Sequence, residues 1–283
     1  MPKLEGCEAV LSRTGFEGKF CPIGAIHMEK ATFGVLGDSH AEALAPGIGA
    51  AAQRAGVRGI LIHQRVGCPP LLGLDRHHQG YDDCPDGAAA TMAYLKAHPE
   101  IATVFLVARW STYIRVQQFH NEEGAFPYIK DSHTQTLSFE ENERVFRRSF
   151  EQTLAQLSSL NRRVIVVTSV PVMKWNVPKT AARALLFNRD IEFRPSLGEY
   201  TDRQAFVTAV FNENKDRYGL SFIHPDRKMC DAQYCAVFDG GKPVYSDHNH
   251  ITKTYALKLS YLFDPIFQAM AHKQEFPPRD AHN

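Results

Sequence analysis

Several features that would assign the chain to a simple class are missing from its sequence. It has no basic run or stripe, and its formal net charge is only +1, which argues against a nucleic-acid-binding protein. No stretch approaches the roughly 18 consecutive apolar residues of a membrane-spanning helix. Residues 1–20 lack the apolar run of a secretory signal. We therefore expect either a cytosolic chain or the soluble part of a larger exported protein.

Metal-ligand spacings are absent as well. Neither a CxxC nor an HxxxH pattern occurs, so we expect no metal site. Six cysteines are present and form three pairs of sequence neighbours, Cys7 and Cys21, Cys68 and Cys84, and Cys230 and Cys235. Local disulfides between them would suit an oxidising compartment, whereas buried free thiols are the alternative. The sequence alone does not select one pairing.

Apolar runs alternate with helical patterns along most of the chain. A length of 283 residues permits one elaborated domain, and no internal repeat or low-complexity tract divides it. Five strands are expected, over Ala31–Gly37, Arg58–His63, Ala102–Ala108, Arg163–Ser169 and Leu220–His224. Strands that alternate with helices predict an α/β fold, a three-layer α/β/α sandwich with a mainly parallel five-stranded sheet.

Two kinds of segment lie outside this alternation. Residues 1–30 have no clear pattern, and we expect an irregular N-terminal extension packed on the core. Residues 31–283 are expected to form the single main domain, with insertions near 64–84 and 111–137. In parallel sheets of this kind, ligands bind beyond the carboxyl ends of the strands, so the residues that follow each strand are the candidates for function.

A serine follows the first predicted strand, in the segment Gly37-Asp38-Ser39-His40. A strand-to-helix turn presents its side chain at the sheet edge, and the free N–H groups of the following helix can stabilise an oxyanion. Ser39 is therefore a candidate nucleophile. The alternative is that Asp38 and Ser39 only cap the helix, since both residue types are favoured there.

A histidine and an aspartate lie far downstream, in Asp247-His248-Asn249-His250. Asp247 and His250 are three residues apart, so one turn of chain can place both side chains on the same side. A serine hydroxyl needs a base to remove its proton, and a carboxylate can orient and steady that imidazole. His248 is an alternative base, and helix capping by Asp247 is an alternative role.

Taken together, these segments resemble the SGNH/GDSL hydrolase superfamily. They most resemble the SGNH domains fused to type-three membrane acyltransferases, which O-acetylate bacterial surface polysaccharides. The matching segments are Gly37–Leu44 (GDSHAEAL), Gly67–Leu71 (GCPPL), Ala108–Trp110 (ARW), and the pair Cys230 and Cys235 followed by Gly241–Pro243 and the DxxH segment. The resemblance spans most of residues 30–260 and implies the flavodoxin-like SGNH fold.

The resemblance also implies roles for individual residues. Ser39 would be acylated, and His250 would act as base and acid, oriented by Asp247. The backbone N–H groups of Ser39 and Gly67 would receive the oxyanion. The superfamily commonly adds an asparagine after the third strand, where this chain has Arg109 and Trp110. Arg109 could supply a charged donor instead or merely pair with an acid, and Trp110 could be a sugar-stacking or a core residue.

The function implied by the resemblance is that of an O-acyltransferase domain on the extracytoplasmic, periplasmic face of a bacterial membrane. It would move an acyl group, expected to be acetyl, through Ser39 to a hydroxyl of a cell-surface glycan. No bound cofactor is expected. A membrane acyltransferase domain, in the same chain or in a partner, would supply an acyl group derived from acetyl-CoA. The alternatives are a carbohydrate acetylesterase with the same triad and a glycan-binding module with a degenerate site.

Overall fold

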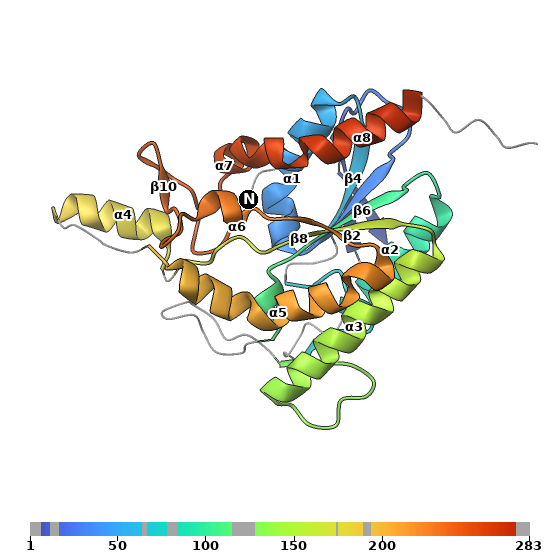
Figure 1. The fold of residues 1–283 in the computed structure, drawn as a ribbon, viewed down its shortest axis with the longest axis horizontal. Coiled ribbons are helices and arrows are strands. Elements are labelled where there is room, and N and C mark those ends of the chain that lie inside the picture. The colour runs from blue at the N-terminus through green and yellow to red at the C-terminus, as the bar shows by residue number, and fades with distance from the viewer. Residues whose placement is uncertain are drawn as a thin grey trace, which may run out of the picture.

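A seven-stranded sheet forms the centre of the molecule in the computed structural model (Figure 1). The structure describes residues 7–11, 17–63, 67–77, 84–114, 128–173, 175–188 and 194–275. Five strands are parallel neighbours, in the order β4 (Arg58–His63), β3 (Phe33–Gly37), β6 (Thr103–Val107), β8 (Arg163–Val167) and β9 (Ser221–Ile223). They fall within the five predicted apolar runs, so the predicted mainly parallel core is confirmed.

Helices cover both faces of the sheet and complete three layers. One face carries α1 (Ser39–Arg54), α7 (Lys253–Lys258) and α8 (Asp264–Glu275), and the other carries α2 (Cys84–Ala97), α3 (Phe139–Ser159) and α5 (Leu197–Tyr218) (Figure 1). In β6, Phe105 and Val107 pack into the first layer, whereas Val104 and Leu106 pack into the second. Because successive strand residues point to opposite faces, both layers require a strand that is apolar throughout.

The N-terminal segment differs from the prediction. Residues 1–30 were expected to be irregular, but β1 (Glu8–Leu11) and β2 (Glu17–Gly24) extend the sheet to seven strands. β2 pairs antiparallel with β4, and β1 pairs antiparallel with β2. The prediction of an irregular segment was wrong because β2 lacks the composition of a typical strand: it contains Pro22 and the charged Lys19 and has no apolar run. Its backbone pairing with β4 could therefore not be inferred from its residues.

The remaining elements are short and lie around the sheet. They are β5 (Asp75–His77), β7 (Tyr128–Lys130), β10 (Phe238–Asp239), β11 (Lys242–Pro243), α4 (Val177–Leu186), α6 (Asp226–Met229) and the 3-10 helices η1 (Trp110–Tyr113) and η2 (Leu259–Phe263). β5 and β7 pair antiparallel, which joins the two predicted insertions. Residues 64–66, 78–83 and 115–127 of those insertions lie outside the described residues.

Disulfides close three local segments. Cys7 is bonded to Cys21, Cys68 to Cys84, and Cys230 to Cys235, so all six cysteines are oxidised and the presence of disulfides is confirmed. The pairing, which the sequence left open, is the local one. Within the described ranges, no helix combines the length and the apolar character that crossing a membrane requires.

Candidate active site

Ser39 lies at the carboxyl end of β3, at the first position of α1. The glycine two residues earlier is needed because a Cβ at Gly37 would lie 1.8 Å from the carbonyl oxygen of Val107 on the neighbouring strand. Asp38 caps α1 by accepting a hydrogen bond from the N–H of His40 at 2.8 Å. The cap is therefore Asp38, and the hydroxyl of Ser39 is available for another contact.

A chain of hydrogen bonds runs from Ser39 to the DxxH segment. His250 Nε2 lies 2.7 Å from Ser39 Oγ, and His250 Nδ1 lies 2.6 Å from Asp247 Oδ2. The other carboxylate oxygen of Asp247 accepts the backbone N–H groups of Asn249 and His250 at 2.7 and 2.8 Å. These contacts bring the three side chains predicted to act together into one serine, histidine and aspartate arrangement.

The DxxH segment is a loop rather than the start of a helix. The following helix, α7, is capped by Thr252, whose hydroxyl accepts the N–H of Tyr255 at 3.3 Å. The alternative capping role for Asp247 is therefore wrong. His248, the alternative base, is not among the described residues that line the cavity at Ser39, and its carbonyl oxygen accepts the N–H of Met173 at 2.7 Å.

Electrostatics favours an ionised Asp247. Burial alone would raise the pKa of its carboxyl group, but the hydrogen bond and charge of His250, together with two backbone N–H donors, hold that pKa well below the usual aspartate range. A carboxylate that stays ionised fixes the Nδ1 proton of His250 and leaves Nε2 directed at the serine.

A second histidine, His40, supports the DxxH loop from beneath. Its Nε2 lies 2.9 Å from Asn249 Oδ1, and its ring centroid is 5.0 Å from that of His250. Complete burial, followed by the nearby charges of His250 and Arg109, lowers the pKa of His40 well below its ordinary value. His40 is thus held neutral, so it can donate to Asn249 without placing a positive charge of its own beside His250.

A small cavity of about 130 Å³ opens beside Ser39 and His250. Both predicted donors, Gly67 and Arg109, line it, together with Arg76, Tyr113 and Asn249. Arg109 is buried at the end of β6, and Gly67 has a φ of 78°, a left-handed conformation that favours glycine. Among the described residues, no group of three or more His, Cys, Asp or Glu side chains is arranged to hold a metal ion.

Arg76 is a cavity residue that sequence reasoning missed. A Cβ on Gly67 would lie 2.3 Å from one terminal nitrogen of Arg76, so the absence of a side chain at position 67 makes room for this guanidinium. Arg76 belongs to β5, which pairs with β7 from the other insertion. The available signal was a basic residue, Arg76, in the same loop as Gly67. The sequence of this loop did not indicate that Arg76 returns to the cavity that Gly67 lines.

Trp110 does not contact the cavity, and its prediction as a substrate-binding residue is wrong. Its side chain is fully buried, and Nε1 donates to the carbonyl oxygen of Val167 at 2.8 Å. Its ring packs edge-on against Phe146, Phe150 and Phe211. The 3-10 helix η1 turns the chain after Arg109, so Arg109 lines the cavity while the next side chain enters the core.

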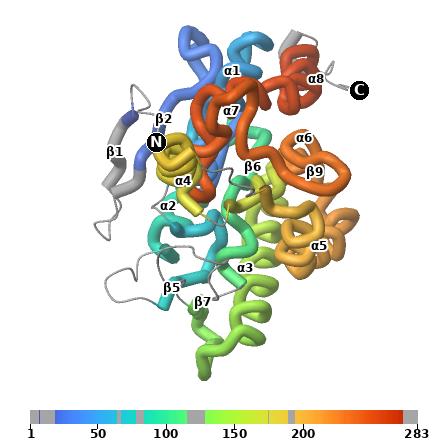
Figure 2. The backbone as a smooth tube through the Cα atoms, turned by 90° about the vertical axis from the view of Figure 1, so that its left-hand side faces the viewer, coloured from blue at the N-terminus to red at the C-terminus, as the bar shows by residue number. Residues whose placement is uncertain are grey.

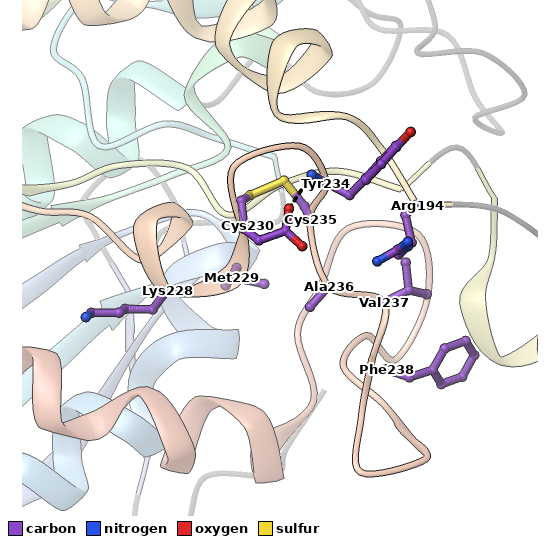
Figure 3. A pocket seen from close by; sticks show the side chains of 10 residues that line it. Arg194, Lys228, Met229, Cys230, Tyr234, Cys235, Ala236, Val237 and Phe238 are labelled. Carbon is purple, nitrogen blue, oxygen red and sulfur yellow. Dashed lines mark hydrogen bonds between the residues drawn. A yellow bond between two sulfur atoms is a disulfide. The ribbon is translucent and has the colours of Figure 1, made fainter.

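A larger cavity, of about 520 Å³, lies around the Cys230–Cys235 disulfide (Figure 3). Arg194 lies over the ring of Tyr234 on its wall, 4.9 Å from the ring centroid. None of the described residues that line this cavity also lines the cavity at Ser39. The larger cavity is therefore separate from the candidate active site.

A comparison with known families identifies the family of this chain. The family model described as the SGNH domain fused to AT3 domains matches residues 7–265. The chain belongs to this family. The search of curated proteins found no match to this SGNH domain.

The periplasmic domain of a lipopolysaccharide acetyltransferase from Salmonella ser. Paratyphi A has a TM-score of 0.59 and 16% sequence identity to this SGNH domain, covering 87% of each chain. At that identity the likeness concerns the fold. A protein from Bacteroides fragilis whose name describes an acylhydrolase gives a TM-score of 0.42 at 13% identity, over 87% of this chain and 93% of the other. The SGNH fold predicted from the motifs is confirmed.

Proposed function

We propose that this SGNH domain is an O-acyltransferase that carries an acyl group, expected to be acetyl, as an ester on Ser39 and passes it to a hydroxyl of a cell-surface glycan. The observation that supports the proposal is the continuous set of hydrogen bonds from Asp247 through His250 to Ser39 Oγ. A membrane acyltransferase domain would present the acyl donor, derived from acetyl-CoA, since the family is one of SGNH domains fused to AT3 domains.

In the first half-reaction, Ser39 Oγ attacks the carbonyl carbon of the donor while His250 Nε2 takes the hydroxyl proton. The tetrahedral intermediate collapses as the bond to the donor's leaving group breaks, and His250 returns the proton to that group. Asp247 keeps the imidazole in the correct tautomer and stabilises its positive charge.

The oxyanion would lie among donors that surround Ser39. The N–H of Ser39 is at the start of α1, where backbone N–H groups have no partner within the helix. Gly67 and Arg109 line the same cavity, and we assign the backbone N–H of Gly67 and the guanidinium of Arg109 to the developing negative charge. In this assignment Arg109 replaces the asparagine that the superfamily commonly uses.

In the second half-reaction, His250 Nε2 removes the proton of a glycan hydroxyl, whose oxygen attacks the carbonyl carbon of the Ser39 ester. The bond between that carbon and Ser39 Oγ then breaks, and His250 returns the proton to Ser39 Oγ. Water in place of the glycan would give an acetylesterase. A free glycan acceptor on the extracytoplasmic side fits a chain with three disulfides, because disulfides persist in oxidising compartments.

The test has two steps. Intact-mass analysis after treatment with a fluorophosphonate should give one adduct, absent in Ser39→Ala and formed much more slowly in His250→Ala. The exposed residues Ser159 and His133 provide matched controls, since Ser159→Ala and His133→Ala should label like the wild type. An unchanged adduct in Ser39→Ala would remove the proposed nucleophile.

Incubation with an activated acetyl ester and candidate glycans then separates transfer from hydrolysis. An O-acetylated glycan supports the acyltransferase. Acetate release without any acetylated glycan favours the acetylesterase, and glycan binding without acyl turnover favours a degenerate binding module.

A further inference from the structure

Helix α4 ends in the most exposed large apolar side chains among the described residues. Leu185, Leu186 and Phe187 have exposed fractions of 84%, 79% and 68%. Figure 1 shows α4 extending beyond the body of the protein, and Figure 2, viewed from that side, shows it in front of the body and nearly end-on. Only Val177, at the start of α4, is buried. Among the described residues, none therefore buries the rest of this helix.

The charged residues of α4 are all basic. Residues 177–188 include two basic residues, Lys179 and Arg183, and no acidic residue. Both basic side chains are exposed, and they are four residues apart, so they lie on one side of the helix. Lys179 and Arg183 lie within about two helical turns of the apolar tip, Leu185–Phe187, on its N-terminal side. A helix with an apolar end and a purely basic flank complements a surface that is apolar inside and anionic outside.

The base of α4 is joined to the DxxH loop. The N–H of Val177 donates to the carbonyl oxygen of Asp247 at 3.0 Å, and the N–H of Met173 donates to that of His248 at 2.7 Å. The ten residues of α4 span ~15 Å at the usual helical rise. The apolar tip thus stands at a fixed distance from the backbone that carries Asp247.

We infer that the tip of α4, Leu185–Phe187, inserts into the interface of an anionic phospholipid bilayer, with Lys179 and Arg183 at the level of the headgroups. Burial of three large apolar side chains supplies the main attraction, and the two cations add an electrostatic contribution that salt weakens. Since α4 is hydrogen-bonded to the DxxH loop, insertion would hold that loop near the membrane surface. The inference goes beyond the proposed acyl transfer and does not depend on it.

Flotation with lipid vesicles tests this inference. The wild-type chain should float with vesicles of mixed phosphatidylglycerol and phosphatidylcholine, and less with phosphatidylcholine alone. The variant Leu185→Ser/Leu186→Ser/Phe187→Ser should lose binding by about tenfold or more. Lys179→Gln/Arg183→Gln should weaken binding to the anionic vesicles several-fold and reduce its salt dependence.

A matched control removes exposed apolar surface elsewhere. Leu257 and Tyr261, with exposed fractions of 42% and 47%, lie in α7 and η2, and Leu257→Ser/Tyr261→Ser should float like the wild type. Insertion can also be observed directly, because a Phe187→Trp variant should lose fluorescence with brominated lipids beyond the loss from the native tryptophans. Circular dichroism and fluorophosphonate labelling should be unchanged in the triple serine variant, which excludes misfolding.

Three results would overturn the inference. They are a wild type that floats with neither vesicle, a triple serine variant that floats as well as the wild type, and a wild type that dimerises through the tip without binding lipid. Sedimentation velocity of the wild type and the triple serine variant identifies the third result. Because these measurements need no acyl donor, their failure would leave the proposed acyl transfer untouched.

Discussion

The hydroxyl of Tyr113 donates a hydrogen bond of 2.6 Å to Asp38 Oδ2, and both side chains are buried. The same oxygen accepts the backbone N–H of Arg109 at 2.9 Å, while Oδ1 accepts that of His40 at 2.8 Å. One carboxylate therefore joins the turn that carries Ser39 to the segment that follows β6. Its position explains how Asp38 can set the distance between Ser39 and Arg109.

Replacing Tyr113 with phenylalanine should loosen this connection. Tyr113→Phe removes one of three hydrogen bonds to a buried carboxylate, and the free energy of unfolding should fall by ~1–2 kcal/mol in urea denaturation. Fluorophosphonate labelling of Ser39 should slow at the same time. Tyr200→Phe is the control, since the hydroxyl of Tyr200 donates a hydrogen bond of 2.8 Å to the carbonyl oxygen of Ser169, and neither residue lines the cavity at Ser39. Equal slowing in both variants would contradict a specific link through Asp38.

Replacing Asp247 with asparagine should act on the chemistry. Asp247→Asn keeps the shape of the side chain but removes the charge that orients His250, so labelling of Ser39 should slow by about three to four orders of magnitude. The exposed pair of Asp239 and Lys258 offers a matched control, and Asp239→Asn should label at the wild-type rate. A similar rate in Asp247→Asn and the wild type would show that the carboxylate does not assist His250.

The buried histidine should make stability depend on pH. Complete burial lowers the pKa of His40 in the folded state, so below the ordinary histidine value of 6.5 the unfolded chain binds a proton that the folded chain excludes. Stability supplied by neutral His40 is present above that pH and is lost as the pH falls below it. In urea denaturation between pH 8 and pH 5, His40→Gln should flatten the decline by up to about 1.4 kcal/mol per pH unit.

The control for this experiment is the exposed His133, since His133→Gln should leave the decline unchanged. Part of the decline should remain in His40→Gln, because burial also lowers the pKa of His63 and of His224. A wild-type stability that does not fall on acidification would contradict a neutral His40.

The strands and the grouping of Ser39, Asp247 and His250 were accessible from sequence because their signals are local. Apolar runs ended by a small or polar residue marked the five parallel strands, and Ser39 and His250 each lay in a short recognisable segment. The contact between His40 and Asn249 was not accessible, because it joins residues 209 positions apart that carry no pattern of their own.

The burial of Trp110 and the presence of Arg76 in the cavity were not predicted, for a related reason. The direction of a side chain after a strand depends on the turn that follows, and η1 sends Trp110 into the core while Arg109 lines the cavity. Arg76 arrives through a three-residue strand whose partner, β7, lies in the other insertion. Pairing of short strands across two loops leaves little trace in composition.

Gly47 offers a test of how the two halves of the site are held together. A Cβ there would lie 2.1 Å from the carbonyl oxygen of Ala256, so α1 and α7 touch through their backbones. Since α1 starts at Ser39 and α7 follows His250, Gly47→Ala should push the two residues apart. We expect a loss of ~1–3 kcal/mol in the free energy of unfolding and slower labelling of Ser39.

Gly198 is the matched glycine for this comparison. It lies in the first turn of α5, where the nearest atom to an added Cβ is 3.9 Å away, so Gly198→Ala should cost neither stability nor labelling rate. If Gly47→Ala proves as stable and as fast to label as the wild type, the helices are able to separate without disturbing the site.

The bond between Cys68 and Cys84 begins one residue after Gly67 and encloses the strand that carries Arg76. One wall of the cavity beside Ser39 is therefore fixed by a covalent link that forms only after synthesis. The five parallel strands contain no cysteine, so their pairing needs no such step. Pairing of the parallel strands and closure of this cavity wall are thus separate events, and the second requires an oxidant.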